Sequence, residues 1–252
     1  ISKFMKLEKI KPKFNNKSNP RIGLITLGSD FRIEKDFNNL IYGKKVDLFV
    51  NRIHCYNPLT KETLVKMADD ITEVTKDILP DEKLDCVAYG CTSGTVAAGF
   101  DSIKKKINLA KPEAKITTPI TSTIKALKKL SIKNISVFTP YTDSINQSVA
   151  DYFKESGINI KVLHYFNIAS DLDIGKVDSD YLFEVLSNLN LEDSQALFIS
   201  CTALPALDLI EELEKKLNKV VLSSNQTLIW DALKLVNNNE PITGYGKLFE
   251  KI

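Results

Sequence analysis

Two cysteines stand in matching surroundings that suit proton-transfer or nucleophilic chemistry. Cys91 occurs in GCTSGT (90–95) and Cys201 in SCTALP (200–205), and each follows a short apolar run and precedes a helix-like segment. A thiol at the end of a strand and the start of a helix meets unpaired backbone N–H groups, which favour the thiolate. The sequence therefore predicts two activated thiols, one in each half of the chain.

Hydroxyl groups follow both cysteines directly. Thr92 and Ser93 come after Cys91, and Thr202 comes after Cys201. Such donors can hold a carboxylate or stabilise the oxygen of an enediolate. A single cysteine at a strand end is more often a small buried residue, but two in matched Cys-Thr contexts favour a functional role.

The two remaining cysteines have different surroundings. Cys86 lies inside an apolar run and is assigned to the core, whereas Cys55 follows a strand without small hydroxyl neighbours and is not expected to be catalytic. The chain has no CxxC pair and only His54 and His164, so we expect no metal site. Walker and GxGxxG motifs are also missing, and we expect chemistry without a cofactor.

Other candidates for substrate binding follow predicted strands. Arg52 is suited to a bidentate grip on a carboxylate, and Tyr141 and Asn167 are suitable donors. Ser29 and Asp30 follow the first strand and are expected to face the same cleft. For single residues the alternatives stay open: Asp30 could cap a helix, Tyr141 anchor a turn, and Arg52 form a surface ion pair.

Short β-branched runs alternate with segments of helical spacing, which predicts an α/β fold with parallel sheets. The predicted strands lie near 21–27, 46–51, 84–90, 134–139, 159–165, 195–200 and 219–223, with a weaker one near 115–118. Apolar residues at helical spacing form three stripes between them: Leu64, Met67, Ile71, Val74, Ile78; Leu182, Val185, Leu186, Leu189; and Ile210, Leu213, Leu217. The segment after Cys91 is also expected to be helical.

The chain contains an internal repeat. Residues 22–30 (IGLITLGSD) resemble 135–143 (ISVFTPYTD), and 87–93 (VAYGCTS) resemble 197–203 (LFISCTA) at nearly the same separation. Two such matches predict two similar α/β halves, each with one cysteine at the C-terminal end of a strand, where open parallel sheets bind their ligands.

The predicted organisation has three parts. Residues 1–20 lack periodicity and form an N-terminal arm, residues 21–118 plus 231–252 form the first α/β half, and residues 119–230 form the second.

Composition excludes several classes of protein. The 252 residues are 43% hydrophobic and 26% charged, and 34 basic against 32 acidic residues leave a formal charge of +2. This balance is typical of a globular protein, and it does not favour a nucleic-acid partner. No apolar run approaches the roughly 18 residues of a membrane span. We therefore expect a cytoplasmic protein with reduced thiols and no membrane partner.

These motifs resemble the aspartate/glutamate racemase superfamily, within its maleate cis-trans isomerase and arylmalonate decarboxylase branch. The resemblance covers nearly all of residues 20–238 and includes the cysteine pair and TPY (139–141). Segments 21–37 and 49–64 are most similar to ectoine-utilisation racemase-like proteins.

The resemblance implies two Rossmann-like halves related by a pseudo-twofold axis, with the active site in the cleft between them. It also implies Cys91 and Cys201 as the catalytic pair, Thr92 and Ser93 as oxyanion or carboxylate donors, and Tyr141 and Asn167 as carboxylate ligands. Maleate isomerases typically have an asparagine where this chain has Asp30, which argues against a simple maleate substrate. Decarboxylases of this branch keep only the second cysteine, so the presence of Cys91 argues against that activity.

The leading hypothesis is a cofactor-independent racemase or isomerase of a small carboxylate, plausibly an amino-acid derivative of ectoine or hydroxyectoine catabolism. One thiolate removes a proton next to the carboxylate and the opposite thiol delivers one. The alternatives are a maleate-type isomerase that adds a cysteine covalently to a double bond, and a non-catalytic carboxylate sensor. Because family members are commonly oligomeric, we expect a homodimer or tetramer.

Overall fold

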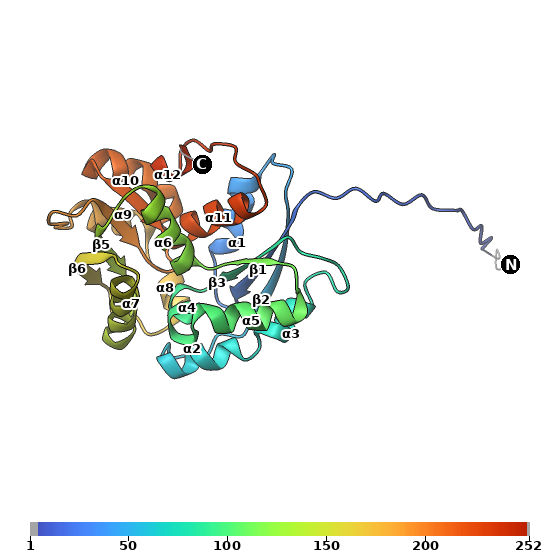
Figure 1. Cartoon of the computed structure of the whole chain (residues 1–252), viewed down its shortest axis with the longest axis horizontal. Helices are drawn as coiled ribbons and strands as arrows, with labels where there is room; N and C mark the ends of the chain where they lie inside the picture. The colour runs from blue at the N-terminus through green and yellow to red at the C-terminus, as the bar shows by residue number, and fades with distance from the viewer. Residues whose placement is uncertain (1–4, 251–252) are drawn as a thin grey trace.

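The computed structural model describes residues 5–250, which form two parallel four-stranded sheets with flanking helices (Figure 1). The first sheet has the order β2-β1-β3-β4 and the second β6-β5-β7-β8. The strands are β1 (Arg21–Leu27), β2 (Asp47–Ile53), β3 (Cys86–Gly90), β4 (Lys115–Thr117), β5 (Asn134–Thr139), β6 (Asn159–Tyr165), β7 (Ala196–Ile199) and β8 (Val220–Ser223).

Helices connect successive strands of both sheets. They are α1 (Ile33–Ile41), α2 (Lys61–Ala68), α3 (Ile71–Lys76), α4 (Thr92–Ala98), α5 (Phe100–Ala110), α6 (Pro119–Lys129), α7 (Asp143–Glu155), α8 (Asp171–Gly175), α9 (Ser179–Ser187), the 3₁₀ turn η1 (Leu207–Leu209), α10 (Ile210–Leu217), α11 (Ser224–Leu235) and α12 (Lys247–Glu250).

The predicted α/β fold is confirmed. Each predicted strand is present with ends that differ by at most two residues, and the two sheets have the same strand order. In this order β1 corresponds to β5, and β3 corresponds to β7. The internal repeat in the sequence therefore reflects one topology used twice, and equivalent strands end at Cys91 and Cys201.

Two helical predictions were too long. The stripe that begins at Leu64 is divided between α2 and α3, because the chain turns at Asp69 and Asp70. The segment after Cys91 is divided between α4 and α5 at Gly99, whose φ of 85° favours glycine. In both cases the apolar spacing continues through a break that only the local backbone reveals.

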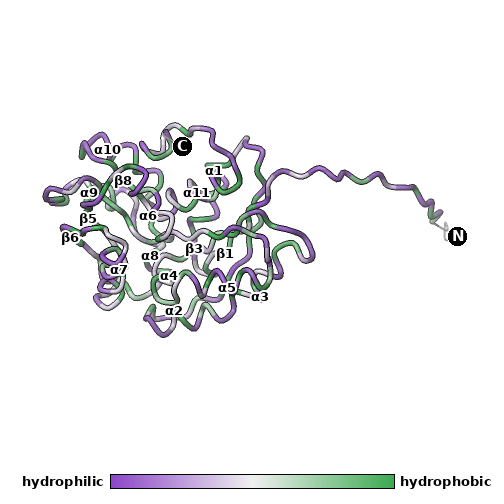
Figure 2. The backbone as a smooth tube through the Cα atoms, in the orientation of Figure 1, coloured by the Kyte–Doolittle hydropathy of each residue, from purple (hydrophilic) through white to green (hydrophobic). Residues whose placement is uncertain are grey.

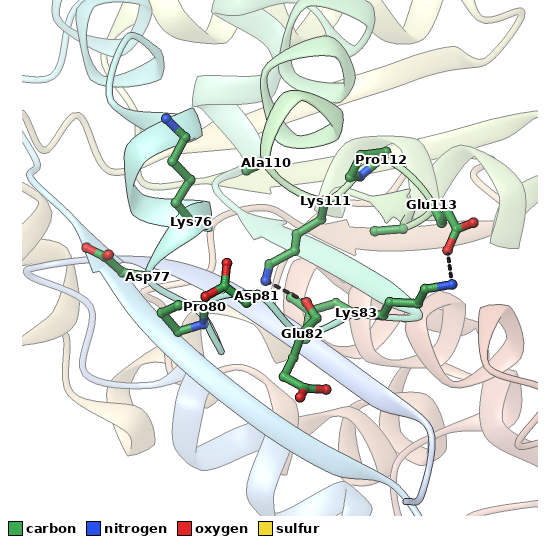
Figure 3. A pocket seen from close by; sticks show the side chains of 12 residues that line it. Lys76, Asp77, Pro80, Asp81, Glu82, Lys83, Ala110, Lys111, Pro112 and Glu113 are labelled. Carbon is green, nitrogen blue, oxygen red and sulfur yellow. Dashed lines mark hydrogen bonds and ion pairs between the residues drawn. The ribbon is translucent and has the colours of Figure 1, made fainter.

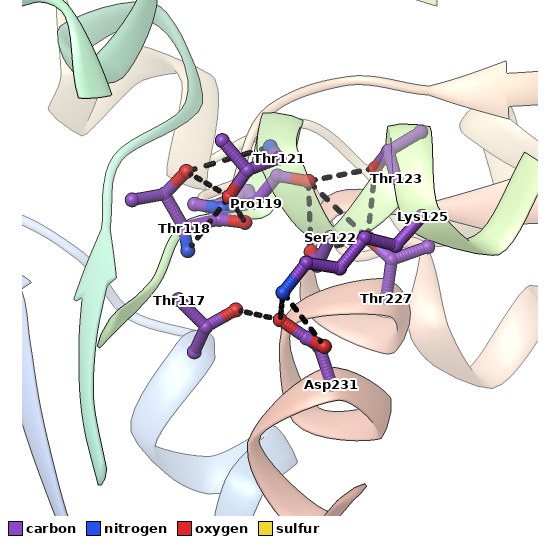
Figure 4. A network of polar contacts seen from close by, with 9 residues as sticks. All are labelled: Thr117, Thr118, Pro119, Thr121, Ser122, Thr123, Lys125, Thr227 and Asp231. Atoms are coloured by element: carbon purple, nitrogen blue, oxygen red, sulfur yellow. Dashed lines mark hydrogen bonds and ion pairs between the residues drawn. The ribbon is translucent and has the colours of Figure 1, made fainter. Parts of the chain in front are cut away.

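A polar junction forms where α6 packs against α11. Thr123 Oγ1 and Thr227 Oγ1 share a hydrogen bond of 2.8 Å, and both hydroxyls contact the carbonyl oxygen of Pro119. The carboxylate of Asp231, buried in α11, accepts from Thr117 at 2.6 Å and from Lys125 at 2.9 Å (Figure 4). This polar junction joins the helix that follows β4 to the helix that follows β8.

The terminal segments lie outside the two sheets. Residues 5–20 have no helix or strand and extend away from the body, and Figure 2 shows this arm as mostly hydrophilic. The predicted arm also includes residues 1–4, which lie outside the described residues. Near the C-terminus, the backbone N–H of Lys247 donates to the carboxylate of Glu214 in α10. The division into halves stays a prediction, and its boundary at residue 230 falls inside α11.

We expect Asp231→Ala to destabilise the protein by about 2 kcal/mol, because it leaves the Thr117 hydroxyl and the Lys125 ammonium without their buried acceptor. Urea unfolding measures the change. Lys128→Ala on the exposed face of α6 is the control and should change the free energy of unfolding by less than about 0.5 kcal/mol. Equal stabilities of the two variants would contradict this role of Asp231.

Candidate active site

Both predicted catalytic cysteines lie at the carboxyl ends of central strands. Cys91 follows β3 and Cys201 follows β7, and their exposed fractions are 4% and 8%. Cys91 is the N-cap of α4, where the backbone N–H of Gly94 donates to its Sγ at 3.2 Å. The carboxyl ends of the two sheets thus present one buried thiol each.

The loops that carry the two thiols are joined through Ser224 at the start of α11. The backbone N–H of Cys201 donates to Ser224 Oγ at 3.0 Å, and the same hydroxyl shares a 2.8 Å hydrogen bond with Thr92 Oγ1. The backbone of Cys201 has a φ of 101°, a conformation unusual for a residue with a side chain. Ser224 therefore fixes both cysteine loops relative to each other.

The prediction of a readily ionised thiol needs a correction. The Gly94 N–H does lower the pKa of Cys91, as expected for the start of a helix, but burial outweighs it and raises the pKa well above its usual range. Burial also raises the pKa of Cys201, and the carboxylate of Asp171 adds to this effect. Both thiols are therefore protonated at neutral pH.

Tyr141 and the hydroxyls that follow Cys91 surround the pair. The Tyr141 hydroxyl lies 3.0 Å from Ser200 Oγ, directly before Cys201, and the Thr92 hydroxyl bonds with Ser224. Ser93 Oγ lies 3.9 Å from the Sγ of Cys91. The structure thus brings together Thr92, Ser93 and Tyr141 beside the thiols, and their roles as substrate donors stay predictions.

Asp30 caps a helix, which is the alternative considered from the sequence. Its Oδ1 accepts the backbone N–H groups of Arg32 and Ile33 at 2.6 and 2.9 Å, and its Oδ2 accepts the hydroxyl of Thr202 at 2.9 Å. Because the Thr202 hydroxyl hydrogen is used in this contact, it is not available to a substrate carboxylate, and the Asp30 carboxylate can only accept. Burial raises the pKa of Asp30 to about 6.

Sequence reasoning missed Asp171. Its carboxyl group is 3% exposed at the start of α8 in the second half, and it accepts a hydrogen bond from the hydroxyl of Ser29 in the first half. Its negative charge raises the pKa of both Cys91 and Cys201. The motif SDLD around it has no feature of its own, and only the contact between halves reveals it.

Cys55 also lies closer to Asp171 and Asp30 than the sequence suggested. Burial raises the pKa of Cys55 to about 11, and the charge of Asp171 contributes to this rise. The high pKa agrees with the prediction that Cys55 is not an activated nucleophile.

Two predicted substrate-binding residues, Arg52 and Asn167, are not among the buried side chains around the two thiols. Arg52 donates to the carbonyl oxygens of Gly28 and Asp30 and pairs with Glu34 at 3.0 Å, so its guanidinium is used within the first half. This matches the surface ion pair considered as its alternative, and we leave Arg52 out of the proposed site. Asn167 is exposed in the loop after β6 with a φ of 63°, and its role stays a prediction.

A separate cavity of about 740 Å³ lies at the opposite edge of the first sheet, before β3 and β4 (Figure 3). There Lys111 donates to the carbonyl oxygens of Leu79 and Glu82, and Lys83 pairs with Glu113. Neither the two catalytic cysteines nor Thr92, Ser93 and Thr202 line it. Among residues 5–250, no helix is long and apolar enough to cross a membrane.

The family of the protein follows from its similarity to known proteins. A family model for arylmalonate decarboxylase matches residues 59–249. The chain belongs to the arylmalonate decarboxylase family. This confirms the predicted branch, and the protein is an enzyme of this family.

Curated relatives include two activities within the family. The chain is 25% identical over 242 residues to a maleate isomerase of Geobacillus stearothermophilus, covering 90% of this chain and 96% of that protein. It is 28% identical over 138 residues to an arylmalonate decarboxylase of Bordetella bronchiseptica, covering 54% and 58%.

Solved structures have the same fold. The maleate isomerase Iso of Pseudomonas putida S16 superposes with a TM-score of 0.83 at 21% identity, covering 92% of this chain and 98% of that one. A mutant maleate cis-trans isomerase of Nocardia farcinica with a covalently bound succinylcysteine intermediate has a TM-score of 0.84 at 18% identity, with the same coverage.

Asp36 of α1 carries a buried carboxyl group that is linked through Asn225 to the loop of Cys201. Its Oδ2 accepts a 2.8 Å hydrogen bond from Asn225, which also donates to the carbonyl oxygen of Thr202. Burial raises the pKa of Asp36 to about 7. The folded state therefore holds a proton that the unfolded chain releases near pH 4, and ionisation of Asp36 destabilises the fold.

We expect stability to fall as pH rises from 5 to 8, with Asp36 contributing on the order of 2 kcal/mol. Asp36→Asn keeps an acceptor for Asn225 but cannot ionise, so its stability should fall less over this range. Thermal unfolding of both proteins across this pH range measures the difference. Parallel curves for the two proteins would contradict the raised pKa.

Proposed function

We propose that the protein is a cofactor-independent isomerase of a small carboxylate, with Cys91 and Cys201 acting on opposite faces of the substrate. The observation that carries the proposal is the position of the two thiols, at equivalent strand ends of two matching sheets and joined through Ser224. Similarity to maleate isomerases supports the carboxylate substrate class.

Racemisation is the reaction that uses both thiols in the same way. One thiolate removes the proton from the carbon next to the carboxylate, and the electron pair of the C–H bond moves into an enediolate. The opposite thiol then gives its proton to the other face of that carbon and becomes a thiolate. Thr92, which follows Cys91, and Tyr141, whose hydroxyl lies beside Ser200, are the groups we propose to stabilise the enediolate oxygens.

Because burial raises the pKa of both thiols, binding of the substrate must help to form the first thiolate. A positively charged group on the substrate does so by Coulombic attraction, and a second carboxylate opposes it. This effect favours substrates that carry one carboxylate.

A second candidate is cis-trans isomerisation of maleate. The thiolate adds to one carbon of the double bond, the electron pair moves to the neighbouring carboxylate, the molecule rotates about the resulting single bond, and expulsion of the thiolate gives fumarate. The covalent succinylcysteine intermediate of the N. farcinica enzyme favours this mechanism for that relative. Decarboxylation is not proposed, because this chain keeps Cys91.

The narrower expectations stay proposals. They are a substrate from ectoine or hydroxyectoine catabolism, a cytoplasmic location, and a homodimer or tetramer. A non-catalytic carboxylate sensor would retain ligand binding without turnover.

Replacement of either catalytic thiol should abolish isomerisation while ligand binding survives. We expect Cys91→Ser and Cys201→Ser each to lower kcat by at least about 100-fold, because a hydroxyl at neutral pH is a far weaker base than a thiolate. The assay is interconversion of enantiomers across a panel of small chiral carboxylates, including N-acetylated diaminobutyrates and aspartate, and formation of fumarate from maleate in parallel.

Cys86→Ala is the matched control, since Cys86 lies fully buried within β3, five residues before Cys91. It should keep wild-type turnover. Unchanged turnover in both serine variants would refute the cysteine mechanism, and a stable mass adduct of maleate on one cysteine would favour the second candidate.

A further inference from the structure

Two buried carboxyl groups, Asp30 and Asp171, lie near the two thiols. Asp30 and Asp171 are each 3% exposed, and both act on the thiols by charge. Among residues 5–250, no basic side chain contributes to holding either carboxyl group. The Arg52 guanidinium near Asp30 contacts backbone carbonyl oxygens and Glu34 rather than either carboxyl group, so the two carboxyl groups oppose binding of a second substrate carboxylate.

The two carboxyl groups differ in how many of their acceptor oxygens already have a hydrogen bond. Asp30 accepts three hydrogen bonds from the protein, through both of its oxygens. Asp171 accepts only the Ser29 hydroxyl, through Oδ2, and its Oδ1 has no hydrogen bond within the described part of the chain. Asp171 is thus the buried carboxyl with spare acceptor capacity near the thiols.

The position of Asp171 suits a role in substrate choice. It begins α8 in the second half, its backbone N–H reaches Asn57 Oδ1 of the first half at 3.3 Å, and its carboxyl group reaches Ser29. These contacts hold it between the halves, on the side of the two cysteine loops. An anion fixed there attracts a substrate cation and repels a substrate anion.

Resting on the proposed function, we propose that Asp171 is a specificity-determining residue that binds an ammonium group, so that the substrate is a small amino carboxylate rather than a dicarboxylate. The single substrate carboxylate then lies with the hydroxyl donors beside Cys91. The ammonium group offsets the charge of Asp171 where that charge opposes thiolate formation at Cys91 and Cys201.

The test compares wild type with Asp171→Asn, and uses Asp173→Asn as the matched control. Asp173 lies on the same short helix but is exposed and pairs with Lys176. Affinities for 2,4-diaminobutyrate and for maleate are measured by calorimetry, and turnover of both by NMR. We expect Asp171→Asn to bind 2,4-diaminobutyrate at least about tenfold more weakly and maleate more tightly, while Asp173→Asn matches wild type.

Unchanged preference in Asp171→Asn would overturn the proposal while leaving the cysteine mechanism intact. Binding of 2,4-diaminobutyrate that depends on Asp171 but gives no turnover would support the role of Asp171 and count against the proposed function.

If Asp171→Asn does not fold, the ligand affinities of the wild-type protein still test the proposal. Its affinity for 2-aminobutyrate should exceed that for 2-hydroxybutyrate by at least about tenfold, and equal affinities would overturn the proposal.

Discussion

The hydroxyl group of Ser224 holds together the part of the molecule on which the proposed chemistry depends. It accepts the backbone N–H of Cys201 and shares a hydrogen bond with Thr92, the neighbour of Cys91. A parallel sheet places its functional groups at the carboxyl ends of its strands. Two such sheets can act on one molecule only if these ends are held close together. Ser224 makes this connection. The packing of α6 on α11 holds in place the helix that begins at Ser224.

Burial gives the site its second constraint. It raises the pKa of Cys91, Cys201 and Asp30, and the charge of Asp171 adds to this effect at both thiols. The thiols are therefore neutral at pH 7 in the free protein, and we propose that the charge of the bound molecule promotes formation of the thiolate. This links substrate choice to catalysis, because a ligand that relieves the negative charge also generates the base.

The sequence predicted the features that local patterns encode. The β-branched runs located all eight strands, and the repeated Cys-Thr segments located both thiols at equivalent strand ends. Contacts between distant segments were not visible in the sequence. Ser224 and Asp171 act through partners in the other half, and Arg52 binds carbonyl oxygens that no motif announces. The pKa of Cys91 was misjudged because the helix terminus is local, whereas burial depends on the whole fold.

The central claim is that two thiols serve opposite faces of one carbon. The most direct measurement follows the reaction of each pure enantiomer of a substrate in heavy water by NMR, at early times. The account predicts that deuterium enters the product enantiomer while recovered substrate keeps its proton, in both directions, because each thiol handles one face. Deuterium in the recovered substrate before any inversion, from both enantiomers, would show a single base and contradict the account.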